Sequence, residues 1–296
     1  MEKMAKSSRP RNFSFTGLFR LTRFPNLLII ALTQYMTALF LTTSTHGLWA
    51  IFAHPGLFWL TSSTLMLAAA GYIINDYYDV KIDYINKPER VIVGRILKRR
   101  IAMIWQLGLN LAGILIGFFL SPWIGLIHCF SAFTLWLYSN QLKRLPFVGN
   151  FSIALLTGVS VLVVAVLFGE KNWLIFTYAY FAFGITLVRE IIKDMEDLKG
   201  DETFGCKTLP IVWGIRKTKQ FVFLLLIVFV ASIFYFVFKA KNEVLNTYFM
   251  VMIIPAALFI LYFLRADTKD KFANLSTFCK LFILSGIISM AFFAAN

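Results

Sequence analysis

The stretch that decides the fold is Asn75–Asp83, NDYYDVKID, which follows directly on the apolar run Phe58–Ile74. It carries Asp76, Asp79 and Asp83, spaced by three and then four residues. Residues at these spacings are neighbours on one face of a helix. Carboxylates at a membrane boundary are costly unless they meet water, a cation or a basic partner. The stretch therefore predicts a functional site at the end of a membrane-spanning helix.

The same acidic spacing recurs in the second half of the chain. Asp194, Asp197 and Asp201 again follow an apolar stretch. Two matching clusters favour a shared function. The alternative is a pair of solvated helix ends, each neutralised by a local lysine, Lys81 in the first and Lys193 in the second.

The composition is that of an integral membrane protein. Hydrophobic residues make up 59% of the 296 residues and charged residues only 15%, far from the balance of soluble domains. Since a span needs about 17 to 25 residues, we predict an all-α polytopic fold with a single domain over residues 1–296, in which residues 1–23 form a basic interfacial segment. The nine predicted spans are 24–43, 57–75, 101–120, 122–139, 151–168, 172–190, 220–239, 246–264 and 276–294.

The distribution of basic residues predicts the orientation in the membrane. If the N-terminus is cytoplasmic, every one of the 29 Lys and Arg residues except Lys171, Lys239 and Lys241 falls on the cytoplasmic side. Both acidic clusters then face the cytoplasm, and the C-terminus lies outside. The net charge of +14 is scattered over short loops and forms no continuous stripe, so we expect membrane lipids and phosphate-bearing substrates as partners and no nucleic acid.

Paired acidic clusters with interleaved basic residues are suited to holding a diphosphate. Mg²⁺ prefers oxygen ligands and typically bridges one or two carboxylates to substrate phosphates. The lysines and arginines beside both clusters would neutralise a polyphosphate, a role that simple cation storage does not need. A lipid-embedded cavity with these charged groups at its mouth suggests an isoprenyl diphosphate as the donor. The metal and the basic side chains would stabilise the diphosphate as it leaves.

The paired motifs, Asn75-Asp76-x-x-Asp79-x-x-x-Asp83 and Asp194-x-x-Asp197-x-x-x-Asp201, resemble those of the UbiA superfamily of intramembrane prenyltransferases. The similarity extends to Arg23, Asn26, Arg90, Tyr138-Ser139-x-x-Leu142-Lys143 and Asn150. The resemblance implies a nine-helix bundle with a cytoplasmic-side cavity and Mg²⁺-dependent prenyl transfer.

The resemblance also implies the site residues. The implied Mg²⁺ ligands are Asp76, Asp79, Asp83, Asp194 and Asp197, and all of these except Asp83 are the expected catalytic residues. The expected substrate-binding residues are Asn26, Asn75, Arg90, Tyr138, Lys143, Arg189, Lys193 and Asp201.

The acceptor is indicated by the second motif. Residues 189–197, REIIKDMED, followed by KTLP at 207–210, most resemble the branch that adds a second geranylgeranyl group to geranylgeranylglyceryl phosphate, a lipid phosphate of ether-lipid synthesis. Residues 90–95 read RVIVGR, where archaeal members of that branch tend to have RPIPSG. The alternatives are an aromatic quinone or haem precursor as acceptor, and a membrane transporter that uses the acidic clusters as ion sites.

Overall fold

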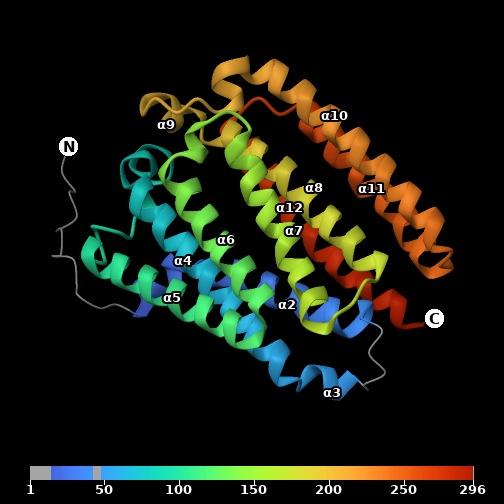
Figure 1. Cartoon of the computed structure of the whole chain (residues 1–296). Coiled ribbons are helices and arrows are strands. Elements are labelled where there is room, and N and C mark those ends of the chain that lie inside the picture. The colour runs from blue at the N-terminus through green and yellow to red at the C-terminus, as the bar shows by residue number, and fades with distance from the viewer. Residues whose placement is uncertain (1–14, 43–47, 296) are drawn as a thin grey trace. The chain divides into compact units, whose positions relative to one another are not determined.

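The computed structural model describes residues 15–42 and 48–295, and these are almost entirely helical (Figure 1). In the described part, β structure is limited to a single bridge between Val93 and Leu97, so the predicted all-α fold is confirmed. The elements are α1 (Phe15–Leu21), α2 (Phe24–Leu41), α3 (Leu48–Phe52), α4 (Pro55–Asn86), η1 (Pro88–Arg90), α5 (Arg99–Leu120), α6 (Pro122–Asn140), η2 (Leu142–Arg144), α7 (Val148–Phe168), α8 (Trp173–Glu196), α9 (Leu198–Thr203), α10 (Leu209–Ala240), α11 (Glu243–Leu264), α12 (Lys269–Ser289) and η3 (Met290–Ala295).

Eight of the described helices are long and apolar enough to cross a membrane, namely α2, α4, α5, α7, α8, α10, α11 and α12. The chain is therefore a multi-pass membrane protein. The predicted span 122–139 lies on α6, which has 19 residues but carries His128, hydroxyl side chains and a terminal asparagine that lower its hydropathy. The predicted count of nine is thus not confirmed. Of the predicted basic interfacial segment, residues 1–14 lie outside the described residues.

Three helices continue well beyond their predicted spans. α4 runs on to Asn86, α8 runs on to Glu196, and α10 already begins at Leu209. Lys and Glu are good helix formers, so a helix does not have to end where its apolar run ends. A helix of 32 residues, as in α4, is about 48 Å long, against about 30 Å for the hydrocarbon core. The first acidic cluster consequently lies on the helical continuation of an apolar span.

The chain divides into two compact units. The first contains the residues up to Ala31 together with Trp59–Gln141, and the second contains Leu32–Phe58 and the residues from Leu142 onward. α2 and α4 each contribute residues to both units. The single-domain organisation stays a prediction.

In the first unit, small residues let the helices approach closely. A Cβ atom on Gly113 of α5 would lie 3.0 Å from the backbone oxygen of Ser63 on α4. A Cβ atom on Gly117 would lie 3.3 Å from Cα of Gly125 on α6, which packs antiparallel to α5. Helices in lipid associate largely through van der Waals packing, and small residues at the contact make this packing possible.

The loop between α4 and α5 packs back onto the first unit. Ile92, Val93 and Leu97 are buried in one cluster with Leu21 of α1 and Ile73 of α4. The chain reverses at Gly94, whose φ of +84° lies in the region that favours glycine. The segment RVIVGR thus contributes buried apolar side chains that hold the loop beside the acidic end of α4.

In the second unit, α7 presents a face of small residues to α8. Ala154, Gly158, Val161 and Ala165 recur at helical spacing and are all buried. A Cβ atom on Gly158 would come within 3.1 Å of the backbone oxygen of Ala179 on α8. This close approach sets the position of α8 relative to the first turn of α7.

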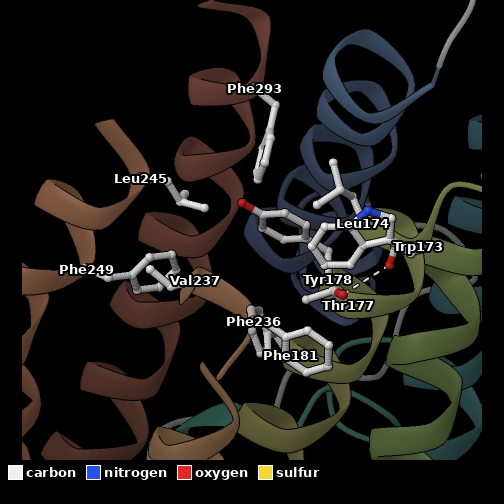
Figure 2. A pocket seen from close by; sticks show the side chains of 10 residues that line it. All are labelled: Trp173, Leu174, Thr177, Tyr178, Phe181, Phe236, Val237, Leu245, Phe249 and Phe293. Carbon is white, nitrogen blue, oxygen red and sulfur yellow. Dashed lines mark hydrogen bonds between the residues drawn. The ribbon is translucent and has the colours of Figure 1, made fainter. Parts of the chain in front are cut away.

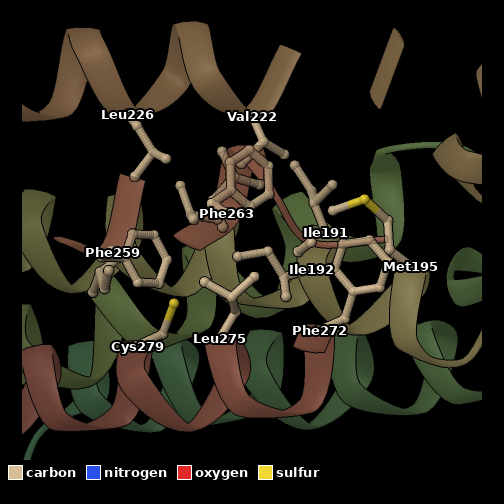
Figure 3. Packing of buried hydrophobic residues seen from close by; sticks show 14 of the residues in the cluster. Ile191, Ile192, Met195, Val222, Leu226, Phe259, Phe263, Phe272, Leu275 and Cys279 are labelled. Atoms are coloured by element: carbon tan, nitrogen blue, oxygen red, sulfur yellow. The ribbon is translucent and has the colours of Figure 1, made fainter. Parts of the chain in front are cut away.

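A cluster of buried apolar side chains surrounds the C-terminal half of α8 (Figure 3). Ile191 and Ile192 of α8 pack there with Phe263 of α11, Leu275 of α12 and Val222 of α10. Tight packing of this kind tolerates little change in side-chain volume. The rotation of α8 about its axis is thereby fixed, together with the directions of the charged side chains that follow.

Candidate functional site

The first carboxylate of the first cluster is paired with an arginine. Arg23 lies between α1 and α2, and its Nη2 donates to Oδ1 of Asp76 at 2.7 Å. The guanidinium also lies over the ring of Tyr72, with Cζ 5.1 Å from the centroid. Burial alone would lower the pKa of Arg23, but Asp76, Tyr72 and Asp83 together outweigh it and the pKa is raised. The Arg23 guanidinium is therefore charged.

Arg23 has an unusual backbone conformation. Its φ of +50° is in the left-handed region, which a non-glycine residue adopts only at a cost. Strain of this kind clusters at functional sites, where surrounding structure holds it in place. Here the turn between the two helices directs the guanidinium at Asp76.

A second arginine contacts the same end of α4. Arg99, the first residue of α5, donates from Nη2 to the backbone oxygen of Tyr77 at 3.3 Å. Its Cζ lies 4.5 Å from the centroid of the Tyr77 ring, a cation–π distance. Tyr77 falls between Asp76 and Asp79, so positive charge lies close to the first cluster.

The remaining members of the first cluster are on the same unbroken helix. α4 continues without a break through Asp79 and Asp83, which are half-buried along with Asn75. The spacing of three and four residues therefore does place the three carboxylates on one face.

The second cluster does not lie on one straight helix. α8 ends at Glu196, Asp197 occupies the junction, and Asp201 belongs to the short α9. After α9, the Lys207 amide donates to the Arg144 backbone oxygen at 2.8 Å, which holds this segment beside η2. The two clusters therefore share their spacing in sequence but lie on differently shaped segments.

Asp194 is held by a residue from another helix. Asn150, which is buried in the first turn of α7, donates from Nδ2 to Oδ2 of Asp194 at 2.8 Å. The turn into α7 passes through Phe147 with φ of +67°, so the chain enters the helix abruptly. The Asn150 amide fixes the orientation of the Asp194 carboxylate and leaves Oδ1 available to other partners.

Glu190 joins two cations one turn before Asp194. Its Oε1 accepts from Nη1 of Arg189 at 2.7 Å, and its Oε2 accepts from Nζ of Lys193 at 2.8 Å. Only 8% of the Glu190 side chain is exposed, so the three charges are largely shielded from water. In the described part of the chain, the buried Arg189 Nε has no hydrogen-bond partner. An anion placed here would find donors already oriented.

Lys143 lies beside the same helix end as Asn150. It belongs to η2, and a Cβ atom on Gly149 would come within 2.8 Å of Cα of Lys143. Glycine is therefore required for η2 to pack against the start of α7. This contact places the Lys143 backbone next to the residue that holds Asp194.

The predicted site residues are divided between the two units. The side chain of Arg90 lies outside the described residues. The first unit contains Asn26, Asn75, Asp76, Asp79, Asp83 and Tyr138, and the second contains Lys143, Arg189, Lys193, Asp194, Asp197 and Asp201.

Arg99 and Glu190 are not among the site residues predicted from the sequence, and Arg23 and Asn150 were expected there only through the family resemblance. The Arg23–Asp76 contact joins residues 53 positions apart, and the Asn150–Asp194 contact joins residues 44 positions apart. No spacing rule reveals such pairs. For Glu190, the available signal was its i, i+3 spacing to Lys193.

The carboxylates fit one mode of Mg²⁺ binding and not another. Within residues 15–42 and 48–295, no group of three or more Asp, Glu, His or Cys side chains is arranged to hold a metal ion alone. Mg²⁺ usually keeps several waters and takes one or two carboxylates together with substrate phosphates. The oxygen donors present suit an ion that a bound phosphate helps to coordinate.

The curated proteins similar to this chain include digeranylgeranylglyceryl phosphate synthases from archaea. That of Methanosphaera stadtmanae is 31% identical over 228 residues, which cover 75% of this chain and 82% of the relative. That of Thermococcus kodakarensis is 40% identical over 149 residues, 50% of this chain and 53% of the relative. The second alignment thus spans about half the length of that relative.

Solved structures share the fold. A structure described as giving insights into digeranylgeranylglyceryl phosphate synthase in membranes matches with a TM-score of 0.65 and 25% identity, covering 93% of this chain and 98% of that chain. A UbiA homologue from Archaeoglobus fulgidus, bound to DMAPP and Mg²⁺, matches with a TM-score of 0.63 at 15% identity, covering 93% and 99%.

The family assignment rests on most of the sequence. Residues 27–286, which include both acidic clusters together with Arg99, Arg189 and Lys193, match the UbiA prenyltransferase family. The curated relative that aligns over three quarters of the chain is consistent with this match. The chain belongs to the UbiA prenyltransferase family and is a membrane prenyltransferase.

Proposed function

We propose that the protein transfers a geranylgeranyl group from geranylgeranyl diphosphate to the free hydroxyl of geranylgeranylglyceryl phosphate. The bond between C1 of the donor and the diphosphate oxygen breaks, and its electron pair leaves with the diphosphate. The acceptor oxygen bonds to C1 and releases its proton, so the products are an ether and diphosphate.

The observation that carries this proposal is the charge arrangement at the end of α8. Arg189 and Lys193 are held by the buried Glu190 one turn before Asp194, whose carboxylate is oriented by Asn150. Pre-oriented cations beside a fixed carboxylate suit a phosphate group and its metal. The curated relatives named as digeranylgeranylglyceryl phosphate synthases support the same acceptor.

The proposed ligands of the metal and the donor diphosphate come from both acidic segments. Asp76, Asp79 and Asp83 of α4 would supply carboxylates of the first segment, and Asp194 and Asp197 those of the second. Arg23 and Arg99 lie beside the first segment, and Lys193 and Arg189 lie beside the second. The remaining expected substrate contacts are Asn26, Asn75, Arg90, Tyr138, Lys143 and Asp201.

Mg²⁺ is the metal that these carboxylates would hold. When bound, it would neutralise the diphosphate as negative charge develops on the leaving oxygens. The chain's own part is to hold the carboxylates and cations in fixed positions before the donor arrives, which is the main source of electrostatic catalysis. The Mg²⁺-bound neighbour from Archaeoglobus fulgidus supports this choice of metal.

The site is proposed to face the cytoplasm. Only Lys171, Lys239 and Lys241 among the 29 Lys and Arg residues fall on the other side of the proposed topology. The N-terminus would then be cytoplasmic and the C-terminus outside.

The activity test uses the purified full chain with labelled geranylgeranyl diphosphate. We expect geranylgeranylglyceryl phosphate to be prenylated with Mg²⁺ and not with EDTA. Asp76→Asn and Asp194→Asn should each lower kcat/KM by about 100-fold or more, the range seen when one preorganised electrostatic contact is removed. Asp267→Asn, on an exposed loop carboxylate paired with Lys271, is the matched control and should be unaffected.

Acceptors without the phosphate decide the substrate class. Faster transfer to an aromatic acid than to geranylgeranylglyceryl phosphate would refute the proposed acceptor. Full activity of both Asp variants would refute the proposed site. Cation flux in proteoliposomes with no prenylated product would refute the reaction itself.

A further inference from the structure

A shallow apolar pocket lies in the second unit, away from the acidic cluster (Figure 2). It is formed where α8 and α11 begin and α10 ends, by side chains that include Trp173, Tyr178, Val237 and Phe249. Tyr178 precedes Asp194 by sixteen residues on the same helix, which corresponds to about 24 Å. The pocket therefore belongs to the opposite end of α8 from the proposed reaction.

Two hydroxyl groups of the pocket wall are already hydrogen-bonded within the protein. The Thr177 hydroxyl donates to the Trp173 backbone oxygen at 3.0 Å, the dashed line in Figure 2. The Tyr178 and Ser289 hydroxyls share a hydrogen bond of 2.7 Å. What the wall offers to a ligand is aliphatic and aromatic surface, and this suits a hydrocarbon chain.

Lys239 lies at the rim of the pocket. The Lys239 ammonium lies 5.2 Å from the centroid of the Trp173 ring, and Lys171 and Lys241 are exposed nearby in sequence. Among the described residues, none of these lysines has a carboxylate within ion-pair distance. The acidic residues next to them are Glu170, which is half-buried, and Glu243, which is exposed. Lys239 therefore places a positive charge at the rim, beside Trp173.

We propose that this pocket binds an anionic membrane lipid, with one hydrocarbon chain against Tyr178 and Val237 and the headgroup phosphate at Lys239. Tryptophan and lysine are side chains that sit at the level of lipid headgroups. Basic residues near the surface attract anionic lipids, and the apolar wall receives the attached chain. The proposal concerns a lipid that is not a reactant, and it is independent of the proposed reaction.

Photo-crosslinking tests the site in the intact protein. The full chain is reconstituted in phosphatidylcholine nanodiscs with a small fraction of phosphatidylglycerol that carries a diazirine in one acyl chain, and crosslinked peptides are mapped. The comparison lipid is phosphatidylcholine with the same diazirine chain. We expect phosphatidylglycerol to label the starts of α8 and α11 more strongly than phosphatidylcholine does.

Two matched pairs of variants test the contributions of the lipid headgroup and of the hydrocarbon chain separately. Lys239→Gln should lower phosphatidylglycerol labelling about fivefold, the effect of one basic residue near the surface, whereas Lys217→Gln at the other end of α10 should not change it. Val237→Phe fills the pocket and should lower labelling by both lipids. Val228→Phe makes the same change at an exposed position of α10 and should leave it unchanged.

Three outcomes would overturn the proposal. The first is equal labelling by the two lipids. The second is unchanged labelling in Lys239→Gln, which does not alter the pocket wall and is expected to fold. The third is loss of labelling when geranylgeranyl diphosphate is added, since this would assign the pocket to the donor chain.

Discussion

Glu190 holds the two cations of the proposed phosphate site at the end of α8. A buried carboxylate is costly, but here it accepts from both Arg189 and Lys193, so each charge has a partner. The Lys193 ammonium has three donors and gives one to Glu190, leaving two for a ligand. Glu190 is thus expected to act through its neighbours, as a positioning residue.

Replacing Glu190 should show whether it positions Arg189 and Lys193 or only forms an ion pair of the kind found on protein surfaces. Glu190→Gln leaves two half-buried cations without their anion, and we expect a loss of about 1–3 kcal/mol of stability. Thermal unfolding in detergent measures this loss of stability. In a separate activity assay, the KM for both substrates should rise by a larger factor than kcat falls. Asp267→Asn also removes the carboxylate of a lysine pair, but that pair is exposed and its loss should not shift the midpoint. Equal midpoints for the two variants would contradict this role.

The kink in α10 shows how the backbone conformation of one residue, Gly214, determines the course of a helix. Gly214 has φ of +79° and ψ of +158° inside a helix of 32 residues, in a region that is essentially restricted to glycine. The kink separates the first turns of α10 from its apolar part. Beyond it, the Lys219 ammonium donates to the Leu264 and Ala266 backbone oxygens at 2.8 Å each, and this caps the end of α11.

An alanine at this kink should be strained even though there is space for it. No atom lies within 4 Å of a Cβ on Gly214, so Gly214→Ala isolates the backbone cost, which we expect to be about 1–3 kcal/mol. Gly108→Ala on α5 is the control. That glycine also has open space but has helical geometry, so the change should be neutral or stabilising by up to about 1 kcal/mol. Parallel behaviour of the two variants in thermal unfolding would rule out a strained kink.

For the molecule as a whole, the proposed reaction requires the two acidic segments to share one bound diphosphate. Each segment by itself offers carboxylates and cations, and the described residues contain no complete metal cage in either unit. A substrate that completes the coordination would link α4 to α8. Such a site would also make donor binding depend on metal, and metal binding depend on donor.

A paramagnetic metal can test this sharing. Nitroxide labels are placed at the exposed Lys81 and Lys199, next to the two segments, in a chain whose cysteines are replaced. With Mn²⁺ and geranylgeranyl diphosphate, both labels should broaden, and Asp76→Asn should relieve the broadening at position 199 as well as at 81. Relief confined to position 81 would mean that the segments bind metal separately. A thermal scan of the cysteine-free chain confirms that it is folded.

The fold class could be predicted because it depends on local properties. The length of each apolar run predicted the helices, and the spacing of Asp76, Asp79 and Asp83 correctly placed them on one face of α4. The helix ends were less well predicted, because charged residues can continue a helix past its apolar run. The same spacing at Asp194, Asp197 and Asp201 spans the end of α8 and the start of α9, since equal spacing does not guarantee a continuous helix.

By itself, the sequence determined a polytopic helical protein with two acidic segments, since apolar length and helical period act within a few turns of chain. The tertiary structure alone decided that Arg23 meets Asp76, that Asn150 holds Asp194, and that the chain turns after α8. These contacts join distant residues, and the close packing of helices on glycine and alanine faces brings them within hydrogen-bonding distance. This packing cannot be predicted from local sequence, because it depends on the shapes of both packed helices.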